Sequence, residues 1–70
     1  MTFPEAIKEI RANKKFSQED FARALGVSFS TINRWERGHT KPTKLAKRAL
    51  QDFCNANQID HIISDIIREA

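Results

Sequence analysis

The segment from Ser17 to Gly38 most constrains the fold, because it reads as two short helices joined by a tight turn. Ser17 is a residue type that caps helix N-termini, and Gly26 supplies the left-handed conformation that ends a helix. Ser28 can cap a second helix, which Gly38 would end. The segment therefore predicts a helix-turn-helix over about residues 17–38.

The second of these helices has two unlike faces. At 100° per residue, Ile32 and Trp35 share an apolar face that we expect to be buried. Ser30, Arg34 and Arg37 point the opposite way and form a short, polar, cationic face. Side chains of this kind can donate hydrogen bonds to base edges in a DNA major groove.

Positive charge is concentrated in one part of the chain. The formal net charge is +3, but residues 34–48 hold six Lys and Arg against the single acidic residue Glu36, whereas residues 49–70 are net acidic. The basic block begins on the polar face of the second helix. We therefore expect a polyanionic partner there rather than a merely solvated surface.

A set of residues recurs at a joint spacing: Gln18, Ala22-x-x-x-Gly26-Val27-Ser28, Ile32, Trp35-Glu36-x-Gly38 and Lys41-Pro42. Together they resemble the helix-turn-helix of the phage-repressor and Cro family, the XRE type. The resemblance covers about residues 5–57. It implies an all-α, compact five-helix, lambda-repressor-like DNA-binding domain, with the helix-turn-helix at helices two and three.

The rest of the chain fits one domain over residues 1–70 with five helices and no sheet. Thr2 can cap a first helix that fades near Asn13. A fourth helix should begin at Pro42 or Thr43 and run to about Asn57. Its apolar residues predict one buried face: Leu45, Ala46, Ala49, Leu50, Phe53 and Cys54.

Isoleucines dominate a last helix, over about residues 59–70, that Asp60 could cap. They recur at three- and four-residue spacing: Ile59, Ile62, Ile63, Ile66 and Ile67. Two interpretations stay open. The stripe either closes the core alone, or its exposed half forms a symmetric dimer seam.

The resemblance also implies which residues read DNA. For base reading the resemblance implies Ser28, Phe29, Ser30 and Arg34; the helical wheel independently selects Ser30 and Arg34 and partly supports Asn33, which joins the expected base-reading residues. For phosphate contact the resemblance implies Gln18, and Arg37, His39, Thr40 and Lys41 are placed to hold the other side of the backbone. Arg34 is the strongest candidate, because its planar fork can donate twice to guanine.

Two positions deserve separate expectations. Phe29 replaces the polar residue common in phage repressors, so half-burial and contact with a thymine methyl both stay open. The recognised DNA sequence therefore cannot be carried over by analogy. Family members often pair the position of Glu36 with an arginine late in helix one, which implies a structural ion pair between Arg11 and Glu36.

The sequence argues against an enzyme. It has no catalytic triad, Gly-rich phosphate loop or metal-ligand spacing, so we expect no cofactor and no metal. Cys54 is the single cysteine and is expected to be a small buried hydrophobe. No apolar run is long enough to cross a membrane. We expect a cytoplasmic, nucleoid-associated protein of bacterial or phage origin.

The leading functional hypothesis is a sequence-specific double-stranded DNA-binding transcriptional regulator, a repressor that binds a palindromic operator as a homodimer. Such dimers place their recognition helices ~34 Å apart. The alternative is the antitoxin of a toxin–antitoxin pair or a protein-docking module. A restriction–modification controller protein is a third hypothesis of similar size.

Overall fold

The computed structural model describes residues 1–70, the whole chain. It contains five helices and no strand: α1 Phe3–Lys14, α2 Gln18–Leu25, α3 Phe29–Arg37, α4 Lys44–Ala56 and α5 His61–Glu69. The predicted all-α, five-helix fold is confirmed. None of the five combines the length and apolar character that a bilayer crossing requires.

Local sequence determines where the helices begin. Thr2 and Glu5 form a capping box at α1, and Ser17 and Asp20 form another at α2, with side chain and backbone bonded in both directions. The hydrogen bonds from Thr2 and Ser17 hold the pKa of Glu5 and of Asp20 below their ordinary values. Side-chain caps thus satisfy backbone N–H groups that lack partners inside the helix.

The glycine that ends α2 makes the turn of the motif possible. Gly26 has a φ of 75°, which is left-handed and strained for any residue with a Cβ. The chain reverses there, and the amide of Val27 donates to the carbonyl of Ala22 at 3.0 Å. The predicted turn between the two helices is confirmed, and α3 starts directly after the cap at Ser28.

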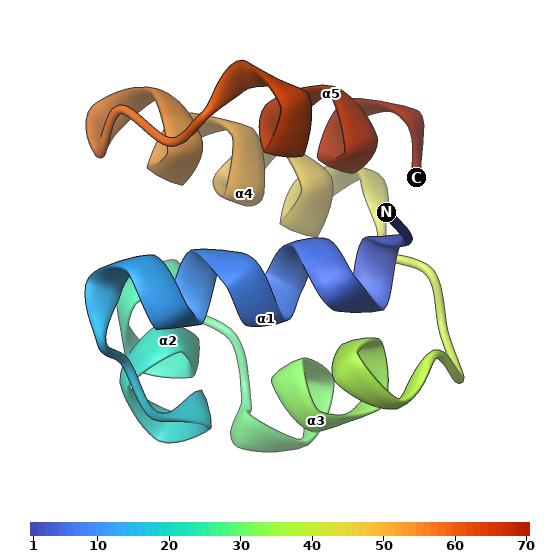
Figure 1. Cartoon of the computed structure of the whole chain (residues 1–70). Helices are drawn as coiled ribbons and strands as arrows, with labels where there is room; N and C mark the ends of the chain where they lie inside the picture. The colour runs from blue at the N-terminus through green and yellow to red at the C-terminus, as the bar shows by residue number, and fades with distance from the viewer.

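The helices form two layers around α1. Figure 1 shows α4 and α5 on one side of α1, and α2 and α3 on the other. Buried side chains from all five helices make one core: Ala6, Ile7, Ile10, Phe21, Ala22, Ile32, Trp35, Leu50, Cys54, Ile63 and Ile67. The recognition motif therefore rests on α1, which contacts α3 directly.

The expected buried face of α4 is wrong at one position. Leu50 and Cys54 are buried, but Leu45 is 82% exposed. On the helical wheel Leu45 lies about 140° from the buried Leu50, so the two side chains point to different sides of α4. Leu45 and Ala46 fit the i, i+1 spacing of a buried helix face, but of the two only Ala46 packs against the core.

Most of the isoleucine stripe of α5 packs inward. Ile63 and Ile67 are buried, while Ile59 and Ile66 are half-buried against the core. Ile62 is the one isoleucine that is largely exposed, at 59%. The core thus covers most of the stripe, and the apolar surface left accessible on it is mainly that of Ile62.

Candidate nucleic-acid interface

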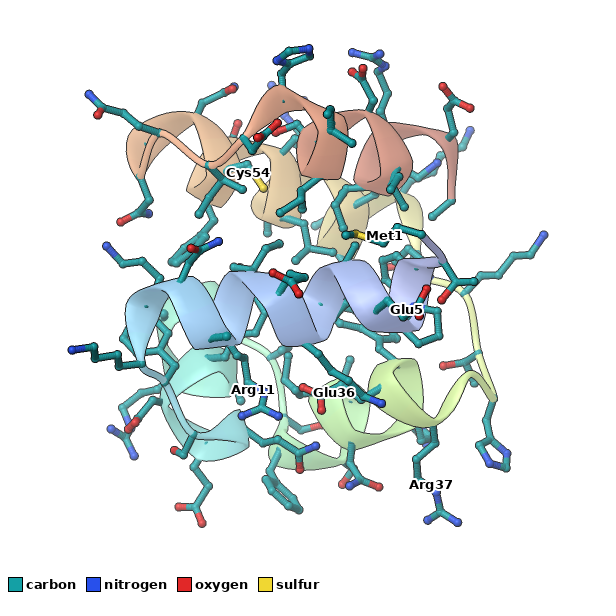
Figure 2. The ribbon with its side chains drawn as sticks, viewed as in Figure 1. Met1, Glu5, Arg11, Glu36, Arg37 and Cys54 are labelled. Atoms are coloured by element: carbon teal, nitrogen blue, oxygen red, sulfur yellow. The ribbon has the colours of Figure 1, made fainter.

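The two faces of α3 differ as the helical wheel predicts. Ile32 is fully buried and Trp35 is 2% exposed, and both pack in the core. Ser30, Arg34 and Arg37 are exposed on the opposite side. Figure 2 shows Arg37 extending from α3 away from the body of the protein. One helix therefore joins a rigid core to a free polar surface.

The start of α3 presents both a polar and an aromatic side chain. The hydroxyl of Ser28 accepts the amide of Thr31 at 3.1 Å and lies 2.9 Å from the hydroxyl of Thr31. Phe29, the first residue of the helix, is 49% exposed. Its ring is therefore half-buried and still accessible. A benzyl group placed there can make apolar contacts but cannot donate to a base edge.

An ion pair fixes α3 to α1. Arg11 Nε lies 2.5 Å from Glu36 Oε2, and Arg11 Nη2 donates to Glu36 Oε1 at 2.9 Å. Arg11 also donates to the carbonyl of Phe16, in the loop before α2, at 3.0 Å. Figure 2 shows the two charged groups facing each other between the helices. This is the pair that the resemblance implies.

The same carboxylate reaches a third helix. Gln18 Nε2 donates to Glu36 Oε1 at 3.0 Å, and Asn33 Nδ2 donates to Gln18 Oε1 at 3.2 Å. The side chains of Gln18 and Asn33 are half-buried. Three elements thus share one polar network, which runs from Arg11 through Glu36 and Gln18 to Asn33.

Electrostatics keep this network charged. Burial by itself would raise the pKa of Glu36, but the hydrogen bonds from Arg11 and Gln18 outweigh it and hold that pKa below its ordinary value. The bond to Glu36 raises the pKa of Arg11. Glu36 is 7% exposed, so its charge is compensated inside the protein rather than by water.

The expected site residues fall into two groups in the structure. Exposed residues come from α3 and from the loop between α3 and α4: Ser28, Phe29, Ser30, Arg34, Arg37, His39, Thr40 and Lys41. Gln18 and Asn33 differ, because both amides are already hydrogen-bonded to protein groups. Sequence reasoning missed this bond, since no spacing rule relates side chains on different helices.

This arrangement defines a helix-turn-helix DNA-binding domain of the lambda-repressor-like class. The helix-turn-helix family model matches residues 7–54, which is more than half of the chain. The chain belongs to the XRE-type helix-turn-helix family. No solved structure matches the chain.

Three curated proteins show how the chain relates to longer ones. A type II methyltransferase, M.SsoII of Shigella sonnei, is 50% identical over 50 residues, which are 67% of this chain and 13% of that protein. The HTH-type transcriptional regulator DicA of Escherichia coli K12 is 40% identical over 61% of this chain and 32% of its own length. The HTH-type transcriptional activator BcrR of Enterococcus faecalis is 31% identical over 91% of this chain and 31% of its own. The chain thus spans a third or less of these relatives.

Proposed function

We propose that this protein is a sequence-specific double-stranded DNA-binding transcriptional regulator. The observation that carries the proposal is the exposed polar face of α3, with Ser30, Arg34 and Arg37 on a helix whose other face is locked in the core. A rigid helix with free donors suits insertion in a major groove. The similarity to two HTH-type regulators supports the same function.

The proposed roles follow the two groups of side chains. Ser28, Phe29, Ser30 and Arg34 read base edges, with Arg34 donating to guanine O6 and N7. Arg37, His39, Thr40 and Lys41 hold the phosphate backbone. Gln18 and Asn33 act together: their shared hydrogen bond orients the amides, and the remaining N–H groups can reach a phosphate or a base edge.

We further propose a homodimer on a palindromic operator, acting as a repressor in the bacterial or phage-infected cytoplasm. A dimer doubles the contacts of a very small reading surface, and its two α3 helices would lie ~34 Å apart to enter successive major grooves. The accessible apolar surface at Ile62 supports a seam along α5. Sedimentation at micromolar protein tests it, and a clean monomer with and without DNA would exclude the dimer.

The experiment for the main proposal is selection from random-sequence duplex DNA at two salt concentrations, with wild type and Arg34→Ala. Wild type should enrich one sequence, and Arg34→Ala should lose discrimination at one base pair by about 1–3 kcal/mol. Arg68→Ala is the matched control, because it removes the same charge from α5. Equal, weak binding by wild type and Arg34→Ala, with capture of a second protein, would instead favour the antitoxin or docking function.

The match to M.SsoII favours a second candidate, a controller of a restriction–modification system. The shared segment is 50% identical over 50 residues. The selected DNA sequence distinguishes the candidates. A site beside methyltransferase or restriction genes in the host genome would support the controller, and a site elsewhere would exclude it.

A further inference from the structure

Asn33 stands at the border between the exposed face of α3 and its buried face. At 100° per residue it lies about 60° from the exposed Ser30 on one side and about 60° from the buried Glu36 on the other. The side chain of Asn33 is half-buried. It can therefore bond to the interior of the protein and to a ligand of the exposed face at the same time.

A hydrogen-bond chain joins Asn33 to the buried carboxylate of α3. Gln18 Nε2 donates to Glu36 Oε1 at 3.0 Å, and Asn33 Nδ2 donates to Gln18 Oε1 at 3.2 Å. The oxygen and the nitrogen of a side-chain amide have nearly the same shape, so shape does not decide which of them faces a neighbour. The direction of the two bonds is therefore set by the chemistry of the group at the end of the chain.

That group is an ionised carboxylate, which accepts hydrogen bonds and cannot donate them. Arg11 bonds to both oxygens of Glu36 and keeps the group charged, and Figure 2 shows the two side chains facing each other. Gln18 must therefore turn its NH2 group to Glu36, which turns its oxygen to Asn33. Asn33 in turn must meet that oxygen with its own NH2 group.

This direction decides what Asn33 offers to a ligand. Nδ2 uses one of its two hydrogens on Gln18, and Oδ1 accepts no hydrogen bond within the protein. No buried side-chain oxygen in the structure lacks a partner, so Oδ1 of Asn33 is accessible to solvent. Asn33 thus keeps one N–H donor and one oxygen acceptor. With the chain reversed, its oxygen would be engaged by Gln18 and two N–H donors would remain.

We propose that Glu36 is a positioning residue for base recognition: through Gln18 it orients the amide of Asn33 so that Asn33 selects adenine. This inference rests on the proposed function. In the major groove adenine presents the acceptor N7 beside the donor N6, which complements one donor and one acceptor. Guanine presents two acceptors, N7 and O6, one of which would face the oxygen of Asn33. The reversed amide would accept guanine instead.

The test measures base preference with duplexes that differ from the selected site at one base pair. Asn33→Ala first identifies the base pair that Asn33 reads, because the preference there should disappear. At that base pair wild type should bind adenine about tenfold more tightly than guanine. All proteins are compared at a temperature where circular dichroism shows them folded.

Glu36→Gln keeps the shape of the side chain and removes its restriction to accepting. A glutamine can turn either its oxygen or its nitrogen to Gln18, so both directions of the chain become available. The preference for adenine should fall to within about twofold, while the preference at the base pair read by Arg34 should not change. In the Asn33→Ala background, Glu36→Gln should have no further effect on that base pair.

Two further variants separate orientation from stability. Gln18→Ala breaks the hydrogen-bond chain but keeps the Arg11–Glu36 pair, so it provides the test if Glu36→Gln does not fold. It should lose the same preference at the same base pair. Ile67→Val is the control for lost stability, because it trims a buried side chain on α5, and it should keep the preference of wild type.

A second measurement alters the DNA instead of the protein. At the base pair that Asn33 reads, adenine is replaced by 7-deazaadenine, which lacks the N7 acceptor, or by unsubstituted purine, which lacks the 6-amino donor. Wild type should bind both modified duplexes several-fold more weakly, because each loses one of the two hydrogen bonds. Asn33→Ala should bind all three duplexes equally well.

The outcomes separate this inference from the function it rests on. If Glu36→Gln and Gln18→Ala both keep the adenine preference of wild type, Glu36 stabilises the fold alone, and the inference is wrong while the regulator proposal stands. The same conclusion follows if Asn33→Ala changes no base preference, or if its base pair prefers guanine. If wild type selects no DNA sequence, both proposals fail.

Discussion

Arg11 and Glu36 lie twenty-five positions apart in the chain, yet their side chains meet in a two-point ion pair with N–O distances of 2.5 and 2.9 Å. Arg11 comes from the last turn of α1, and Glu36 from the last turn of α3. The bond from Gln18 to Glu36 joins α2 to the same pair. One buried carboxylate therefore links the recognition helix to both α1 and α2.

Removing that carboxylate should be costly. Glu36→Ala leaves Arg11 and Gln18 without their acceptor in a mostly buried site, and we expect a loss of about 2–3 kcal/mol in the free energy of unfolding. In a 70-residue domain this corresponds to a drop of about 10 °C or more in Tm. Glu9→Ala, at an exposed position of α1, is the control. A Tm within a degree of wild type would make the pair a mere surface contact.

The same pair makes stability depend on pH. The folded-state pKa of Glu36 lies below its ordinary value of 4.5, so its contribution is complete above that value and is lost as the pH falls through the folded pKa. Urea unfolding at pH 7 and near pH 3 should show wild type losing more stability than Glu36→Gln. Asp20 and Glu5 also titrate low in both proteins and cancel in the comparison. An equal loss for both proteins would contradict the prediction.

Two isoleucines of α5 should respond in opposite ways to truncation. Ile67 is fully buried, so Ile67→Ala should remove about 3 kcal/mol from the free energy of unfolding. Ile62 is 59% exposed, and Ile62→Ala should stay within about 0.5 kcal/mol. Urea titration at low protein concentration measures both. A large effect of Ile62→Ala that grows with protein concentration would place this residue in a dimer interface.

The turn glycine offers a test of backbone strain. A Cβ at Gly26 would meet no atom within 4 Å, so Gly26→Ala isolates the strain of the left-handed conformation, about 1–2 kcal/mol. Lys15 already adopts a left-handed φ of 57° at the end of α1. Lys15→Gly should therefore change the free energy in the opposite direction, by up to about 1 kcal/mol. Thermal melts of both variants check the signs.

Lysine contacts with phosphate should be visible in the salt dependence of DNA binding. Lys41→Ala should lower the magnitude of the log–log salt slope by ~0.9 if Lys41 neutralises one phosphate. Arg68→Ala should leave the slope unchanged, because Arg68 lies on α5 and pairs with Asp65 at 2.6 Å. An unchanged slope for Lys41→Ala would place its ammonium away from the backbone.

Features that depend on neighbouring residues could be predicted from the sequence. Capping by Thr2 and Ser17, the stop at Gly26 and the two faces of α3 all involve residues within four positions of one another, where helix geometry sets the distances. The single error in the buried face, Leu45, comes from the first turn of a helix. The apolar pattern of α4 already includes this residue, although its side chain is exposed.

The family resemblance also predicted the Arg11–Glu36 pair, because it carries information about which helices are in contact. It did not predict the hydrogen bond between Gln18 and Asn33.

The sequence by itself determined five helices, their ends and the polar face of α3, since these follow from local hydrogen bonding and periodicity. Only the tertiary structure decided that one carboxylate, Glu36, serves both α1 and α2 and that Ile62 stays outside the core. These features depend on how the helices pack, and packing is set by the whole core at once.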